Sequence, residues 1–135
     1  MINDSPKIAF MYPYPGMENS SPRVFYQLQN GQVDIGVGIA FMSLDPTKDY
    51  QCGIEIFSPS EVDVLNTHGG IILFPLSHLS IEPGYGVTFA QIGMTLSTTG
   101  RGNHKIVCTL FDQNESEPLD KREAWFCIVL SVEIK

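Results

Sequence analysis

Residues 24–37 read VFYQLQNGQVDIGV, in which apolar and polar side chains alternate on both sides of Asn30-Gly31. Alternation with a period of two is typical of a β-strand with one buried face. Asn-Gly between two such runs indicates a type I′ turn, because both central residues of that turn need positive φ. We therefore expect an antiparallel hairpin with one apolar face. Its cross-strand pairs would be Leu28–Val33, Tyr26–Ile35 and Val24–Val37.

A second hairpin is predicted around the loop at residues 99–103, because alternating runs flank it in the same way. Val87 and Phe89 are out of phase with Ile92, so we expect a bulge near Ala90-Gln91. The pairs predicted for this hairpin are Ile92–Leu110, Met94–Cys108 and Leu96–Ile106.

The rest of the chain continues the β pattern. Short apolar runs separated by Gly, Pro and Asp turns predict further strands at residues 7–12, 50–57, 71–74 and 124–134. No segment has apolar residues at helical spacing over three turns, and the Ser58-Pro59-Ser60-Glu61 capping signal supports one helical turn at most. We therefore predict one domain over residues 1–135, an antiparallel β-sandwich of seven or eight strands, with a barrel or jelly roll as the alternative.

The order of short strands, ending in a Trp- and Phe-rich strand, resembles an immunoglobulin-like sandwich at the level of architecture. The Cys…Trp…Cys spacing of true immunoglobulin domains is absent, because no two cysteines flank Trp125 at the required distances. The resemblance therefore implies a fold and no function.

Composition narrows the classes of partner. The chain of 135 residues has a net charge of −7, and its basic residues are not clustered, so we expect neither nucleic acid nor an anionic membrane surface as a partner. The N-terminus has no basic start and no apolar run of a secretory signal. Three cysteines do not make a disulfide framework, so we predict a cytoplasmic protein with free thiols. Cys52 and Cys108 are in phase with apolar neighbours, and Cys127 lies in an apolar run, so all are expected in the core.

The metal patterns are incomplete. His68, His78 and His104 form no ligand pair at metal-site spacing. The acidic loop at residues 112–123 matches part of a calcium loop but has Glu117 where the sharp turn needs Gly. Its weak candidate ligands are Asp112, Asn114, Ser116 and Glu123. We expect no metal and no cofactor.

Catalytic patterns are incomplete as well. No Gly-x-Ser-x-Gly elbow occurs, and nothing marks a cysteine as an activated thiol. The Gly-rich segment at residues 98–105 carries Arg101 and His104 and resembles an anion nest, but it opens no helix, and a hairpin turn is the simpler interpretation. The sequence therefore predicts a protein that is not an enzyme.

Surface recognition is the remaining class of function. Tyr12 and Tyr14 lie on a Pro-stiffened segment, and Tyr85 lies between two glycines, where rigid rings could stack on sugars or dock a partner. The run at residues 125–130 is apolar on both faces, so either the chain's own loops or a partner chain covers it.

The hypothesis is a non-catalytic interaction or assembly module that binds a protein partner. That partner could be a second copy of the chain, in a homodimer. Its predicted binding residues are Tyr12, Tyr14, Tyr85, Arg101 and His104. One alternative is a metal protein or small enzyme that uses His68, His104 or the acidic loop. The other is a carbohydrate-binding module, which would require secretion.

Overall fold

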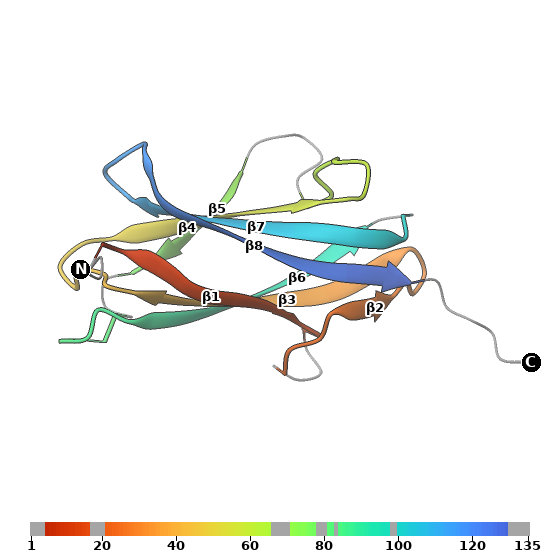
Figure 1. Ribbon diagram of the computed structural model, residues 1–135, viewed down its shortest axis with the longest axis horizontal. Coiled ribbons are helices and arrows are strands. Elements are labelled where there is room, and N and C mark those ends of the chain that lie inside the picture. The colour runs from red at the N-terminus through yellow and green to blue at the C-terminus, as the bar shows by residue number, and fades with distance from the viewer. Residues whose placement is uncertain are drawn as a thin grey trace, which may run out of the picture.

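The structure is a computed structural model that describes residues 5–16, 21–65, 71–77, 81–82, 84–97 and 100–129. These residues form eight strands and no helix. Two sheets pack face to face in two layers (Figure 1), so the predicted β-sandwich is confirmed. The strands are β1 (Lys7–Tyr14), β2 (Phe25–Gln27), β3 (Gln32–Met42), β4 (Tyr50–Phe57), β5 (Ile72–Leu76), β6 (Thr88–Ser97), β7 (Gly102–Asp112) and β8 (Pro118–Val129).

One sheet has three strands in the order β1-β3-β6, and the other has five in the order β2-β8-β7-β4-β5. All neighbouring strands are antiparallel except β2 and β8, which are parallel. The inner faces are filled by alternate apolar residues of both sheets, which makes one buried core. Its largest fully buried side chains include Phe41, Tyr50 and Phe126.

The Asn30-Gly31 turn forms, but the hairpin that it was expected to start does not extend. Asn30 and Gly31 have φ of 55° and 75°, and Gln29 and Gln32 exchange two backbone hydrogen bonds of 2.9 and 3.0 Å. Beyond this bridge β2 joins β8 in one sheet and β3 joins the other sheet. The predicted pairs from Leu28–Val33 to Val24–Val37 are therefore wrong. Alternation specifies which face is buried but leaves the partner strand open.

The second predicted hairpin is also wrong, since β6 pairs with β3 and β7 pairs with β4 and β8 in the opposite sheet. The chain crosses between layers where a hairpin loop was expected. The bulge expected near Ala90-Gln91 is absent, because β6 pairs with β3 in unbroken register. Phe89 is out of phase with Ile92 simply because it faces outward and is 48% exposed. An irregularity lies instead in β1, between Ile8 and Phe10.

The remaining predicted strands agree with the observed ones to within a few residues, except the last. β8 begins at Pro118, six residues before the predicted start, and the predicted end at residue 134 lies outside the described residues. The expected turn at Ser58–Glu61 is present as a tight turn. Because the part of the chain that the structure describes contains no helix, it offers no helical membrane span either.

Candidate functional site

Three side chains line up across neighbouring strands on the outer face of the five-stranded sheet. Phe57 of β4 pairs with Lys105 of β7, which in turn pairs with Trp125 of β8. The Lys105 ammonium lies 5.7 Å from the Phe57 ring centroid and 5.8 Å from that of Trp125, so one cation contacts two rings. It also lies 3.7 Å from the Glu123 carboxylate, which is half exposed. Trp125 is 55% exposed although its ring is held in a regular strand.

A pocket of about 430 Å³ opens beside this row. One wall of the pocket is the turn after β4, which two backbone hydrogen bonds close. Glu61 N–H donates to the Ser58 carbonyl at 2.8 Å, and Ser58 N–H donates to the Val62 carbonyl at 2.9 Å. Glu61 has φ of 64°, a conformation that a non-Gly residue adopts only when its surroundings enforce it. The turn therefore forms a fixed wall. The lining is Phe57, Ser58, Pro59, Glu61, Asn103, Lys105 and Trp125.

The chemistry of this pocket combines flat rings with polar groups. Asn103 supplies an amide donor and acceptor, Lys105 a cationic donor and Glu61 an acceptor carboxylate. All three line the same pocket as the exposed ring of Trp125. A ligand that has an apolar face and a polar rim fits such an arrangement.

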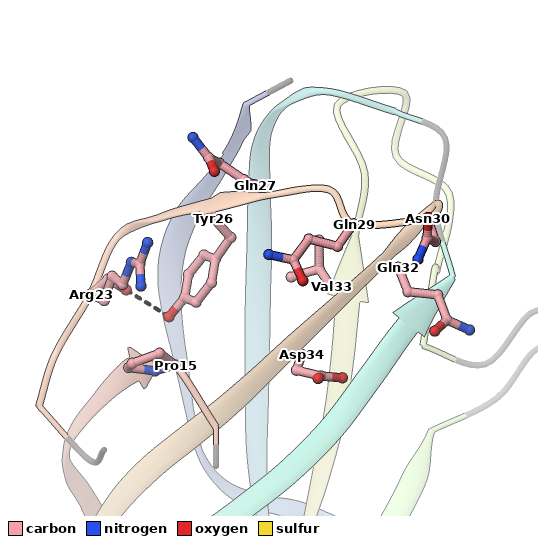
Figure 2. A pocket seen from close by; sticks show the side chains of 9 residues that line it. All are labelled: Pro15, Arg23, Tyr26, Gln27, Gln29, Asn30, Gln32, Val33 and Asp34. Atoms are coloured by element: carbon pink, nitrogen blue, oxygen red, sulfur yellow. Dashed lines mark hydrogen bonds between the residues drawn. The ribbon is translucent and has the colours of Figure 1, made fainter. Parts of the chain in front are cut away.

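A second pocket, of about 320 Å³, opens where β2 and β3 separate towards different sheets (Figure 2). Its lining is mostly polar, and its one aromatic residue, Tyr26, is 4% exposed. The Tyr26 hydroxyl donates to the Arg23 carbonyl at 2.9 Å, and burial raises the Tyr26 pKa. The Arg23 guanidinium lies 4.9 Å from the Phe25 ring and 5.7 Å from that of Tyr26. No open aromatic face is therefore available in this second pocket. The lining is Pro15, Arg23, Tyr26, Gln27, Gln29, Asn30, Gln32, Val33 and Asp34.

Tyr12 and Tyr14, both predicted binding residues, lie side by side on the outer face of the three-stranded sheet, with ring centroids 6.1 Å apart. Each ring covers a glycine of β3: a Cβ on Gly38 would lie 2.6 Å from Tyr12 Cζ, and one on Gly36 would overlap the Tyr14 ring. These glycines permit the close approach of the rings to the β3 backbone. Tyr14 is 6% exposed as a result.

Two further rings join Tyr12 on this outer face. Phe10 lies 6.3 Å and Phe89 6.2 Å from it, with ring planes inclined by 21° and 20°. Phe10 is 54% exposed, because the irregularity between Ile8 and Phe10 turns its side chain away from the core.

The other predicted binding residues do not join one site with the tyrosines. Tyr85 is 76% exposed in the turn before β6, and Arg101 is exposed just before β7. His104 is fully buried on the inner face of β7, where its ring stacks on Phe126 at 5.1 Å. Its Nδ1 lies 3.0 Å from the Gly102 carbonyl oxygen, and its Nε2 has no partner. Burial lowers the pKa of His104 and the hydrogen bond to Gly102 opposes that change. His68 and His78 lie outside the described residues.

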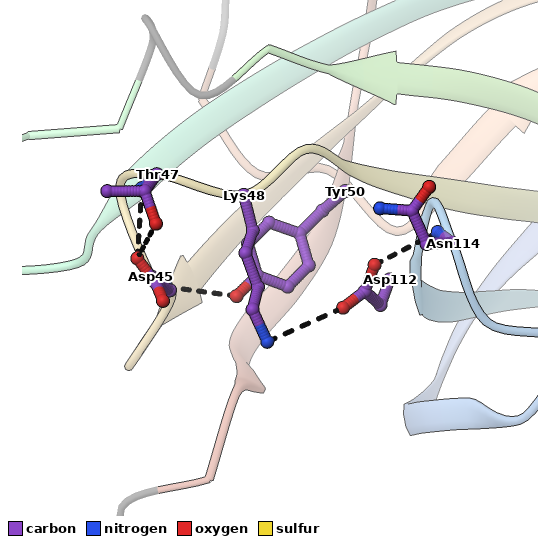
Figure 3. Close-up of polar contacts among 6 residues, drawn as sticks. All are labelled: Asp45, Thr47, Lys48, Tyr50, Asp112 and Asn114. Atoms are coloured by element: carbon purple, nitrogen blue, oxygen red, sulfur yellow. Dashed lines mark hydrogen bonds and ion pairs between the residues drawn. The ribbon is translucent and has the colours of Figure 1, made fainter.

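The acidic segment forms a turn and then a strand, and the carboxylates of Asp112 and Glu123 both have protein partners. Asp112 is 6% exposed, accepts the Asn114 N–H at 3.0 Å and lies 3.8 Å from the Lys48 ammonium (Figure 3). Ser116 lies in the exposed turn, and Glu123 lies on β8 beside Lys105. Within the described ranges no three His, Cys, Asp or Glu side chains come together as metal ligands do.

The same figure shows hydrogen bonds in the loop that precedes Tyr50. The Tyr50 hydroxyl accepts the Asp45 N–H at 2.9 Å. Asp45 also accepts hydrogen bonds from the side chain and backbone of Thr47, and these bonds lower the pKa of its carboxyl group. This end of the sandwich is polar, but its polar groups bind each other.

The cysteines are free thiols, as expected. Cys52 and Cys108 are buried in the core, as predicted from their phase, and their mutual hydrogen bond together with burial raises the pKa of Cys108. Cys127 is only half-buried and points to the outer face next to Asn103, so the core prediction is wrong for it.

Sequence reasoning missed Phe57, Lys105 and Asn103, which make the Trp125 pocket. They come from strands about 20 to 70 residues apart, and only the strand order brings them together. The one available signal was Trp125 itself, a large ring at an outward position of the last strand.

Scans against protein-family models and against curated proteins give no match to this chain. Solved structures do match it. A putative beta-galactosidase from Bacteroides fragilis has a TM-score of 0.62 at 12% identity, over 89% of this chain and 17% of that chain. A Bifidobacterium dentium beta-glucuronidase complexed with coumarin-3-O-glucuronide has a TM-score of 0.57 at 14% identity, over 92% of this chain and 18% of that chain.

A bacterial adhesin from Mobiluncus mulieris has a TM-score of 0.59 at 10% identity, over 93% of this chain and 58% of that chain. This chain therefore spans less than a fifth of the length of the two glycosidases and a little over half of the adhesin. At such identities the likeness shows a shared β-sandwich fold and carries no activity across.

Proposed function

We propose that this domain is a non-catalytic module that binds carbohydrate in the Trp125 pocket. The observation that carries the proposal is the exposed ring of Trp125, 55% accessible, at the edge of a pocket that is also lined by the hydrogen-bonding side chains of Asn103, Lys105 and Glu61. Large exposed rings on rigid strands are costly to leave in water and lose little entropy on binding.

The ligand class follows from the two kinds of surface that a sugar presents. A pyranose ring has an apolar C–H face that packs on an aromatic ring, and a rim of hydroxyls that both donate and accept hydrogen bonds. Trp125 would take the face, and Asn103, Lys105 and Glu61 would take the rim. The Phe57 ring across the row limits how far the sugar can slide.

The fold supports the same proposal in a general way. Domains of this fold occur within a putative beta-galactosidase, a beta-glucuronidase and a bacterial adhesin. Each is a larger protein in which a sandwich of this size is one part, so a binding role for one such part is reasonable.

The hypothesis of a protein partner, with self-association through edge strands or loop ends, stays a prediction. Trp125 is open to solvent and not covered by the chain's own loops, so a partner chain on that outer face and a sugar would compete for the same ring. The cytoplasmic location also stays a prediction, and a ligand outside the cell would require export.

The test uses Trp125 as its own reporter, since the chain has a single tryptophan. The protein is titrated with cellohexaose, chitohexaose, xylohexaose and a hyaluronan hexasaccharide while its fluorescence is recorded. We expect at least one of them to shift the emission saturably. Calorimetry on Trp125→Ala should then show an affinity about 30-fold lower, because a central aromatic contact contributes about 2 kcal/mol.

The matched control is Phe25→Ala, which removes a ring of similar exposure (52%) that does not line the pocket. This variant should bind as the wild type does. Failure of all four sugars to change the fluorescence, or equal binding by Trp125→Ala, would contradict the proposal.

A further inference from the structure

Glu61 stands in the wall of the Trp125 pocket in a backbone conformation that suits glycine better. Its φ is 64°, in the left-handed region, where the Cβ atom approaches the following carbonyl oxygen. Glycine at this position would relieve that strain. Strained residues cluster at binding sites, because a side chain that is needed there offsets the lost stability. The strain therefore indicates that the Glu61 side chain has a function.

The turn fixes the place from which this side chain extends. Besides the two backbone hydrogen bonds that close the turn, the Ser58 hydroxyl accepts the Val62 N–H at 3.3 Å. Val64 N–H donates to the Ile56 carbonyl at 2.8 Å and attaches the end of the turn to β4. Glu61 itself is exposed, and its carboxylate has no hydrogen-bond or ion-pair partner among the residues that the structure describes. A ligand in the pocket thus meets a free acceptor at a fixed position.

The charges around the pocket favour a cation over an anion. Lys105 is the one basic residue among the described residues of the lining, and its ammonium already lies 3.7 Å from the Glu123 carboxylate. That pair is formally neutral, which leaves the carboxylate of Glu61 uncompensated. The whole chain has a net charge of −7, so its field also attracts cations and repels anions.

We propose that Glu61 makes the Trp125 pocket selective for amino sugars, because its carboxylate forms an ion pair with their protonated amino group. The inference rests on the proposed carbohydrate site and names its substrate class. In a β-linked glucosamine oligosaccharide the amino group replaces a ring hydroxyl, so it belongs to the polar rim while the C–H face packs on Trp125. The ammonium group only donates hydrogen bonds and the carboxylate only accepts them.

The aromatic rings of the pocket stabilise a cation as well. The Lys105 ammonium lies 5.7 Å from the Phe57 ring centroid and 5.8 Å from that of Trp125, so these rings already accommodate a positive charge. Trp125 is 55% exposed and therefore has ring surface left for a ligand. An ammonium group on a sugar that packs against Trp125 is attracted by the ring in addition to Glu61.

The test compares a β-linked glucosamine hexasaccharide with chitohexaose, its uncharged N-acetylated counterpart. Calorimetry on the full chain at about pH 6, where carboxylates are ionised and the sugar amines are largely protonated, gives the ratio of the two affinities. We expect the glucosamine sugar to bind about fivefold more tightly in about 20 mM salt, which is the effect of one exposed ion pair. About 0.5 M salt should remove most of this preference, because it screens exposed charges.

Two variants separate the ligand contact of Glu61 from its backbone strain. Glu61→Gln keeps the size of the side chain and removes its charge, so the two sugars should bind equally well. Glu61→Gly should lose the preference too, yet raise the melting temperature by about 2–4 °C, because it relieves the left-handed strain. A lower melting temperature would overturn the inference, since the side chain would then support the turn.

The matched control is Glu117→Gln, which removes the same charge from an exposed position. Glu117 lies between β7 and β8, at the end of β7 away from Asn103. This variant should keep the full preference, because the preference depends on a contact in the pocket and not on the net charge of the chain.

Hexalysine is the probe for a competing class of ligand, a basic peptide, and it should bind more weakly than the glucosamine sugar. The outcomes separate the role of Glu61 from the carbohydrate site itself. No response of Trp125 to any sugar contradicts the site. Three results would overturn only the role of Glu61: neutral sugars that bind as well as the glucosamine sugar, a preference that persists in Glu61→Gln, or hexalysine that binds as tightly as the glucosamine sugar.

Discussion

Mild acid will destabilise this fold through His104. The imidazole is fully buried and stacks on Phe126. The Gly102 carbonyl can only accept a hydrogen bond, so Nδ1 carries the proton and Nε2 is left as a buried acceptor without a partner. Protonation of Nε2 would bury a charge, and burial accordingly lowers the pKa of His104 below its usual 6.5.

The direction of the pH effect follows from linkage. Because the pKa of His104 is lower in the folded than in the unfolded chain, the unfolded chain binds more protons below about pH 6.5, and the free energy of unfolding falls as the pH falls. One proton bound only by the unfolded chain changes that free energy by about 1.4 kcal/mol per pH unit. Between about pH 8 and about pH 5.5 the loss is therefore up to about 1.4 kcal/mol.

Urea unfolding at several pH values, followed by Trp125 fluorescence and far-UV circular dichroism, measures this loss. His104→Leu keeps a side chain of similar volume and removes the titrating group. The difference between wild type and variant isolates His104, because the variant retains the other two histidines. We expect the wild type to lose the extra stability in acid and the variant not to. Parallel curves for the two proteins over this pH range would refute the reasoning.

Three further predictions concern other parts of the fold. In the native protein only the Cys127 thiol should react with a thiol reagent, about one equivalent per chain, because the other two cysteines are buried. Gly36→Ala should cost about 1–3 kcal/mol in a thermal melt, because its Cβ would overlap the buried ring of Tyr14, whereas Gly93→Ala faces open space and should cost nothing. Asp112→Ala should cost about 1–2 kcal/mol, because it removes a buried charged acceptor of the Asn114 N–H.

Each of these predictions has a clear opposite result. Reaction of two or three thiols without denaturant would mean that the core around Cys52 and Cys108 opens readily. Equal melting temperatures for Gly36→Ala and Gly93→Ala would show that the ring of Tyr14 does not lie over β3. A neutral Asp112→Ala would show that the carboxylate does not hold the turn.

Features that depend on a few neighbouring residues could be predicted from the sequence. Asn30-Gly31 adopts the predicted positive φ angles, and β4 has the predicted bounds. Which strands pair with each other could not be predicted from the sequence. After the Asn30-Gly31 turn the chain continues in one sheet while β2 lies in the other, and nothing in the alternation distinguishes that crossing from a longer hairpin.

The burial of His104 could have been predicted, because it is in phase with Ile106 and Cys108 on the inner face of β7. The outward position of Phe10 could not, since it depends on a register irregularity in β1 that alternation does not reveal. Tyr12 was predicted as a binding residue, and its ring neighbour Phe89 belongs to β6, far along the chain, so the sequence could not place the two rings together. The Trp125 pocket needs the strand order for the same reason.

The most direct test of carbohydrate binding is a ¹H–¹⁵N correlation spectrum of the labelled chain, recorded during titration with the sugar that changes the fluorescence. The single indole N–H signal reports on Trp125, and backbone amides report on the rest of the pocket. We predict progressive shifts of the indole signal and of the amides of Asn103, Lys105 and Glu61, with β1 and β6 unaffected. Shifts confined to Tyr12 and its neighbours in β1 and β6, or no shift of the indole signal at saturation, would contradict the account.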